Sequence, residues 1–130
     1  MNYIERDDDK LKDECGVFGV IATQRPVARL IHFGLFALQH RGQESAGMAV
    51  WDGKDLNVRK GMGLVSDVFD DKNLESLKGS WGVGHVRYST TGGSLLQNAG
   101  PFAVDSNLGF IVVAHNGNVV NADELRNELI

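Results

Sequence analysis

The 130-residue sequence has one cysteine, two prolines and no long apolar run, and these shortages exclude whole classes of protein. A single cysteine cannot form an internal disulfide, and no spacing of Cys and His resembles a zinc site, so we expect a reducing, cytoplasmic location. The longest apolar run, GFIVVA at 109–114, is too short to span a bilayer. The sequence therefore predicts a chain that is neither exported nor embedded in a membrane.

Basic residues are also in short supply. The chain has 13 Lys and Arg against 17 Asp and Glu, a net charge of −4. Such a surface attracts neither a phosphate backbone nor an anionic membrane, so we expect no nucleic acid and no membrane as partner. The apolar fraction of 42% is typical of a folded domain, and small molecules are the favoured substrates.

Charge is concentrated at the start of the chain, where residues 1–14 hold six acidic and three basic side chains. This segment has too little apolar surface to offset the entropy lost on ordering. We therefore predict a leader over 1–14 and a domain over 15–130.

Apolar periodicity predicts the main elements of that domain. A helix is predicted from Pro26 to about His40, and Asp52-Gly53 predicts a hairpin between 45–52 and the segment DLNVRK. Strands are predicted at 16–22, 81–89 and 109–115.

Three further expectations concern details of these elements. The continuous apolar run at 109–115 predicts a strand covered on both faces, and residues 66–78 are interpreted as a short helix. Asn121 and Glu124 form a candidate capping pair for a last helix. Together the pattern predicts an α+β sandwich of mostly antiparallel strands flanked by helices.

Cys15 lies at the border between the charged leader and the first strand. A lone cysteine is most often a packed small side chain. The alternative is a nucleophile: if residues 1–14 are removed, the α-amine of Cys15 becomes free to act as the base for its own thiol. An α-amine has a reference pKa of about 7.7–8.0 and a thiol about 8.5, which suits proton transfer near neutrality.

Polar side chains near two later strands are candidates for ligand contacts. Arg87 on a half-buried strand needs a carboxylate partner, either an internal acid or the α-carboxylate of an amino acid. His85 on the same strand is interpreted as a hydrogen-bonded structural residue. Asn116-Gly117 is typical of a tight turn, but an Asn amide and a Gly backbone N–H are also the donors that an oxyanion hole requires. The loop LQHRGQESAG at 38–47 is either a polar loop with a turn at Gly42 or a site wall.

Four stretches in this order resemble the N-terminal glutaminase region of the amidophosphoribosyltransferases, also called glutamine phosphoribosylpyrophosphate amidotransferases. The stretches are CGVFGV at 15–20, LQHRGQESAGMA at 38–49, GHVRYSTTGG at 84–93 and AHNGNVVNA at 114–122. The resemblance implies an N-terminal-nucleophile hydrolase fold, a four-layer αββα sandwich of two antiparallel sheets that is truncated in this chain.

The resemblance also implies roles for individual residues. Cys15 would attack the side-chain amide of glutamine, and Asn116 and Gly117 would stabilise the oxyanion. Arg87, with support from the segment around Thr90, would bind the substrate α-carboxylate, and Arg41 would order the surroundings of the nucleophile. No metal ligand is implied among these residues.

Further implications concern the full-length protein. A missing domain would use the ammonia to convert phosphoribosylpyrophosphate to phosphoribosylamine in purine biosynthesis, with Mg²⁺ present. A 4Fe-4S cluster and a homo-oligomer are also expected there, and no cofactor is expected within this chain.

The family pattern differs in one motif and continues past this sequence. Gly100-Pro101-Phe102 stands where the family usually has Gln-Pro-Phe, and the acid that holds the substrate α-amino group is expected after Ile130. HRGQES favours this family over amino-sugar-forming and asparagine-forming relatives, which remain the alternative. A further alternative is that the 130-residue chain is an inactive fragment.

Overall fold

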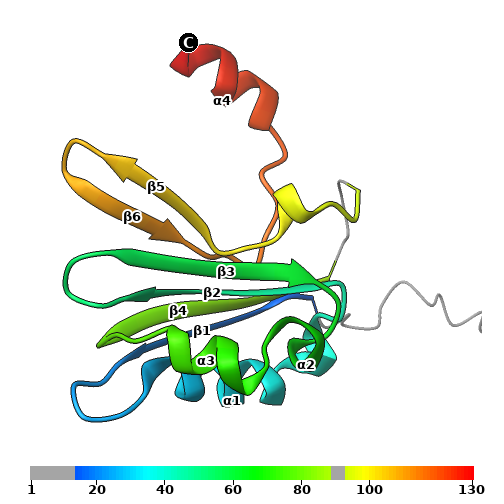
Figure 1. Cartoon of the computed structure of the whole chain (residues 1–130). Helices are drawn as coiled ribbons and strands as arrows, with labels where there is room; N and C mark the ends of the chain where they lie inside the picture. Colours follow the sequence, from blue (N-terminus) through cyan, green and yellow to red (C-terminus); the bar gives the residue numbers. More distant parts are fainter. Residues whose placement is uncertain (1–13, 89–92) are drawn as a thin grey trace, which may run out of the picture.

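The computed structural model describes residues 14–88 and 93–130, and within them the strands form two antiparallel sheets (Figure 1). The larger sheet has the order β1-β4-β2-β3, with β1 at Gly16–Ile21, β4 at Trp81–Arg87, β2 at Ser45–Trp51 and β3 at Leu56–Met62. The smaller sheet pairs β5, Phe102–Ser106, with β6, Gly109–Val113. The predicted α+β class with antiparallel sheets is confirmed.

Helices cover one face of the larger sheet and the smaller sheet lies over the other (Figure 1). The covering helices are α1 at Val27–Ala37, α2 at Val65–Val68 and α3 at Asp71–Ser76. The last helix, α4 at Ala122–Leu129, projects away from this body and has no buried residue. Short 3₁₀ turns lie at Gln39–Arg41 (η2) and Leu96–Asn98 (η3).

The core lies between α1 and the larger sheet. Val27, Ile31 and Leu35 recur every four residues along one face of α1, and each is fully buried. They belong to the same apolar cluster as Met48 of β2 and Val86 of β4. Burying each such side chain contributes about 1.5–3 kcal/mol, so this stripe fixes the helix on the sheet.

The opposite face of β4 points toward the smaller sheet. Because side chains alternate along a strand, Trp81 and His85 lie on the face opposite to Val86. Trp81 stacks on Trp51 of β2 with ring centroids 6.2 Å apart, and Trp51 contacts Phe110 of β6 at 5.7 Å. These aromatic contacts join the two sheets.

The predicted strands at 16–22 and 81–89, the helix from Pro26 and the hairpin are confirmed. At the hairpin turn Gly53 has φ +103°, and Asp52 accepts hydrogen bonds from the backbone N–H groups of Lys54 and Asp55. The predicted short helix at 66–78 is instead two helices, because the Asp70 carboxylate accepts from the backbone N–H of Asn73 and starts α3 anew.

Two expectations about the later elements are wrong. The Asn121 side chain makes no capping hydrogen bond, although α4 does begin after it. In β6, Phe110, Ile111 and Val113 are 42%, 51% and 49% exposed, so the strand is not covered on both faces. In the part of the chain that the structure describes, β5 and β6 pair only with each other, and these exposed fractions show that their sheet is left partly uncovered.

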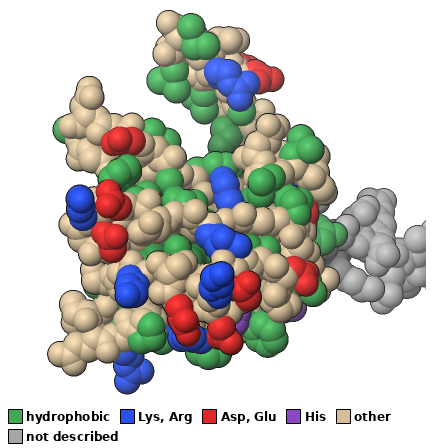
Figure 2. Space-filling model, in the orientation of Figure 1, with side chains coloured by type: hydrophobic (Ala, Val, Ile, Leu, Met, Phe, Trp, Pro, Cys, Tyr) green, Lys and Arg blue, Asp and Glu red, His purple; other side chains and the backbone are tan. Residues whose placement is uncertain are grey.

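The face that carries the short helices is mixed in charge. In Figure 2 acidic and basic side chains lie side by side there, and Arg29 of α1 contacts Asp71 and Glu75 of α3. None of the helices within 14–88 and 93–130 combines the length and apolarity needed to cross a bilayer.

Candidate active site

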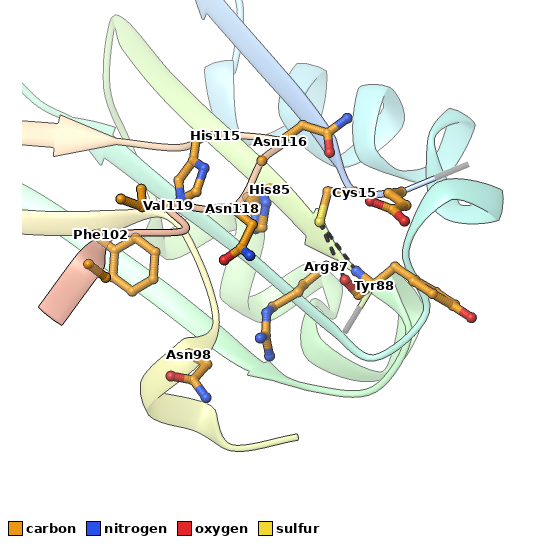
Figure 3. Close-up of a pocket in the computed structure, with 13 residues that line it drawn as sticks. Cys15, His85, Arg87, Tyr88, Asn98, Phe102, His115, Asn116, Asn118 and Val119 are labelled. Atoms are coloured by element: carbon orange, nitrogen blue, oxygen red, sulfur yellow. Dashed lines mark hydrogen bonds between the residues drawn. The ribbon is translucent and has the colours of Figure 1, made fainter. Parts of the chain in front are cut away.

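A pocket of about 240 Å³ lies where the first residues of the domain meet the segment after β6 (Figure 3). A cavity of about 150 Å³ accommodates benzene, so this one has room for a ligand of amino-acid size. Among its lining residues are Cys15, Arg87, Asn116 and Gly117. Four residues predicted from three separate motifs therefore line one cavity.

Cys15 immediately precedes β1 and is only partly buried. Its thiol lies 3.6 Å from the Tyr88 carbonyl oxygen, and the Tyr88 backbone N–H donates to Sγ at 3.5 Å (Figure 3). Cys15 is therefore not a small side chain packed in the core, which was the alternative interpretation.

The backbone at Cys15 is unusual because its φ is +48°, in the left-handed region that residues other than glycine rarely adopt. Such conformations cost on the order of 1–3 kcal/mol and occur most often at functional sites. The strained residue is thus the one that carries the only thiol of the chain.

Arg41 holds the main chain on both sides of this residue. From η2, its Nε donates to the Cys15 carbonyl oxygen at 2.7 Å, and an Nη donates to the Glu14 carbonyl oxygen at 3.2 Å. Arg41 is not among the residues that line the pocket, and these two contacts are with the main chain at positions 14 and 15.

A glycine is needed at position 42 because the chain passes close to β4 there, and not because of the turn predicted at this position. Its backbone is extended, with φ −158° and ψ 119°. A Cβ there would lie 2.7 Å from backbone atoms of Arg87. The loop after α1 therefore presses directly against β4, which brings Arg41 and Arg87 to the same end of the sheet.

Arg87 has an internal acid as a partner, one of the two possibilities that the sequence left open. Its Nη1 lies 3.4 Å from Oε2 of Glu44, and both side chains are 13% exposed. Nη1 also lies 3.5 Å from the Gly93 carbonyl oxygen. The guanidinium reaches the pocket as well, so the pairing with Glu44 fixes a side chain that can still face a ligand.

Asn116 and Gly117 follow β6 as two bends and do not form a hairpin turn. A two-residue hairpin turn of the Asn-Gly type requires positive φ, and neither residue has it. These φ values exclude the two-residue hairpin turn, and the segment lines the pocket across from Cys15 (Figure 3). Thr90, the remaining predicted substrate contact, lies outside the described residues.

Two residues of the site were not identified from the sequence. Tyr88 contacts the thiol through its main chain, a role that any residue type could fill, so no sequence signal exists for it. His85 lines the pocket at 5% exposure, and neither ring nitrogen has a hydrogen-bond partner, so its interpretation as a hydrogen-bonded residue is wrong.

The His85 pKa is lowered chiefly by burial, which disfavours the charged ring. The main chain of His115 opposes this shift, although no hydrogen bond of ordinary geometry joins it to the His85 ring. The charges of His115 and Arg87 lower the His85 pKa further. His85 is therefore neutral at pH 7, with one N–H donor and one acceptor nitrogen.

Comparison with known proteins gives the same assignment as these residues. The chain is 56% identical over 116 residues to the amidophosphoribosyltransferase of Methanocaldococcus jannaschii and 54% identical over 122 residues to that of Synechococcus elongatus. These alignments cover 88% and 94% of this chain. Over nearly its whole length the chain therefore matches a region of the amidophosphoribosyltransferases. It spans about a quarter of the length of these relatives, and no protein-family model matches it.

Solved structures confirm that the fold is that of amidophosphoribosyltransferases, and with it the predicted N-terminal-nucleophile hydrolase class. One, described as the allosteric regulatory enzyme of purine biosynthesis, superposes with a TM-score of 0.78 at 44% identity, covering 87% of this chain and 24% of that one. Another is the glutamine phosphoribosylpyrophosphate amidotransferase of B. subtilis in complex with ADP and GMP. It gives a TM-score of 0.70 at 39% identity and covers 89% of this chain and 24% of that one.

Proposed function

We propose that this chain is the glutaminase part of an amidophosphoribosyltransferase. The observation that carries the proposal is that Cys15, Asn116 and Gly117 line one and the same pocket. A nucleophile opposite an amide donor and an unobstructed backbone N–H is the arrangement that acyl transfer from a carboxamide requires.

The chemistry follows from these groups. The Cys15 thiolate attacks the side-chain amide carbon of glutamine, and the Asn116 amide and the Gly117 N–H stabilise the resulting oxyanion. The C–N bond then breaks as the leaving nitrogen takes up the proton that the thiol gave up, so ammonia departs and a γ-glutamyl thioester remains. Water hydrolyses the thioester to glutamate and restores the thiol.

Arg87 is proposed to bind the α-carboxylate of glutamine. A guanidinium carries five N–H donors in a planar fork, so one side chain can contact both Glu44 and a ligand carboxylate. Support from the segment around Thr90 is part of this proposal. Arg41, through the Cys15 carbonyl, keeps the nucleophile in place for the attack.

Residues 1–14 are proposed to be a leader whose removal activates Cys15. While Glu14 is attached, the Cys15 nitrogen is an amide and cannot accept a proton. After cleavage it becomes an α-amine within reach of its own thiol and serves as the general base.

In the full-length protein we propose that the ammonia displaces pyrophosphate from phosphoribosylpyrophosphate, giving phosphoribosylamine for purine biosynthesis in the cytoplasm. Mg²⁺, a 4Fe-4S cluster and a homo-oligomer belong to that proposal. Within 14–88 and 93–130 no three His, Cys, Asp or Glu side chains converge, so no residue described here is assigned to either metal group.

The test is Cys15→Ala in the full-length enzyme. We expect glutamine-dependent product formation to be lost and ammonia-dependent formation to continue, because only the first needs the thiol. Loss of both activities in a folded variant contradicts the assignment. Intact-mass measurement of the active enzyme should show that residues 1–14 are gone, and a retained leader would disprove the role of the α-amine.

A second candidate is that the 130 residues alone are inactive, which the exposed face of β6 favours. Glutamine hydrolysis by the isolated chain would refute it. An amino-sugar-forming or asparagine-forming activity would be revealed by testing those acceptors on the full-length protein.

A further inference from the structure

His85 is the most deeply buried ionisable side chain in the pocket, and neither of its ring nitrogens is hydrogen-bonded. It lies in the middle of β4, between Val17 of β1 and Gly47 of β2. A buried polar group without a partner costs about 1–3 kcal/mol and is rare in folded proteins. The ring therefore has hydrogen-bonding capacity that no described hydrogen bond uses.

The ring is held in one orientation by Gly100, which lies directly against it. A Cβ at Gly100 would lie 2.7 Å from Nδ1 of His85 and 3.0 Å from Cγ. The Nδ1 edge therefore packs on the Gly100 backbone, and Nε2 occupies the part of the ring farther from it. Both ring nitrogens are buried, and Nε2 is the one farther from Gly100.

The main chain of His115 lies close enough to the His85 ring to influence its pKa. The contact with that main chain raises the His85 pKa. A carbonyl acceptor has this effect and an N–H donor does not, so the contacting group is the His115 carbonyl. His115 also lines the pocket and is joined directly to Asn116 (Figure 3). In ligand-free enzymes, hydrogen bonds of the working site are often long and tighten only when substrate is bound.

We infer that His85 donates a hydrogen bond from Nε2 to the His115 carbonyl when glutamine occupies the pocket, and that this contact sets the position of Asn116 and Gly117. His85 is then a positioning residue, since it acts on the oxyanion through the neighbouring segment and does not touch the substrate. The inference rests on the proposed glutaminase function.

The expected kinetic signature follows from that role. The oxyanion forms only during the reaction, so misplacing its donors lowers kcat and leaves KM nearly unchanged. Removing a whole oxyanion donor costs about 10²–10³ in rate, and displacing the segment that carries two donors should cost about 10-fold or more.

The experiment compares His85→Gln with His85→Asn in the full-length enzyme. The glutamine amide can place an N–H near the position of Nε2, whereas the shorter asparagine amide places it near Nδ1, against Gly100. Both are neutral amides, so they differ mainly in reach. We expect His85→Gln to retain most of the kcat for glutamine hydrolysis and His85→Asn to lose about 10-fold or more, with KM within about twofold for both. His32→Gln on α1, outside the pocket, is the matched control and should keep both constants.

Equal kcat values for the two folded variants, or a loss carried mainly by KM, would overturn the inference. A readout independent of turnover is the ¹⁵N spectrum of the His85 ring in the Cys15→Ala variant with glutamine bound. A single Nε2–H tautomer supports the contact, and an Nδ1–H tautomer refutes it. If the wild-type enzyme hydrolyses no glutamine, the proposed function fails. If it does and the variants are equal, the function stands and only the role of His85 is refuted.

Discussion

Replacing Glu44 by glutamine should destabilise the protein, because Glu44 neutralises Arg87 in a mostly buried position. Removing one member of a fully buried ion pair costs about 3–5 kcal/mol, and losing an exposed pair costs about 0–1 kcal/mol. The Glu44–Arg87 pair lies between these limits: both side chains are 13% exposed and the contact is 3.4 Å. The glutamine side chain also keeps an acceptor oxygen. We therefore expect Glu44→Gln to lower the free energy of unfolding by about 2 kcal/mol.

The measurement is urea unfolding followed by the fluorescence of Trp51 and Trp81, whose stacking across two strands is lost on unfolding. The midpoint should fall while the slope stays constant, which indicates a change in stability and not in the compactness of either state. Under the proposed function, the variant should also show a raised KM for glutamine, since Arg87 is less firmly held.

Glu75→Gln is the matched control. Glu75 also pairs with an arginine, Arg29, at 3.6 Å, but the two side chains are 72% and 36% exposed. The same substitution there should change stability by no more than about 0.5 kcal/mol. Equal effects of the two substitutions, or a stabilised Glu44→Gln variant, would refute the argument from burial.

Three further predictions concern the pocket and the folded state. Asn116→Ala should lower the kcat for glutamine hydrolysis about 10²–10³-fold. Asn118→Ala removes an amide from the same wall of the pocket and should keep kcat within about tenfold. Similar losses in the two variants would argue against Asn116 as the oxyanion donor. Backbone N–H groups lower the pKa of Asp52 below its ordinary 3.8, so its contribution to stability is present above that pH and is lost as the pH falls through the lowered value. Urea midpoints of Asp52→Asn should therefore depend less on pH in this acidic range than those of the wild type, and identical profiles would contradict the prediction. Gly100→Ala should lower the free energy of unfolding by about 1–3 kcal/mol, because its methyl group would overlap the buried ring of His85. Gly19→Ala is the control, since no atom lies within 4 Å of the added methyl group, and it should not destabilise the protein. An unchanged stability of Gly100→Ala in thermal or urea unfolding would show that the ring can move.

Local sequence patterns predicted the elements that are buried against other residues of this chain. The four-residue spacing of Val27, Ile31 and Leu35 indicated the face of α1 that packs on the sheet. Asp52-Gly53 indicated the hairpin, because only a residue tolerant of positive φ closes that turn. The motif residues Cys15, Arg87, Asn116 and Gly117 were identified by chemistry and order, and the structure brings them to one pocket.

Features that depend on distant neighbours were predicted poorly. The apolar run of β6 indicated burial, but a run of apolar residues does not say whether the covering layer lies in the same 130 residues. Strand β5 was not predicted, since five residues are too few to establish an alternating pattern. The unpaired His85 ring and the contact of the thiol with the Tyr88 main chain depend on how separate strands meet, which residue types alone do not indicate.

The left-handed conformation at Cys15 has a consequence for the proposed removal of residues 1–14. The torsion φ of this residue is defined by the carbonyl carbon of Glu14, so hydrolysis of the Glu14–Cys15 bond eliminates the torsion together with its strain. Strain of about 1–3 kcal/mol shifts such an equilibrium about 5–150-fold toward the cut chain. If residues 1–14 are removed as proposed, the loss of this strain disfavours rejoining of the two ends, whichever agent makes the cut.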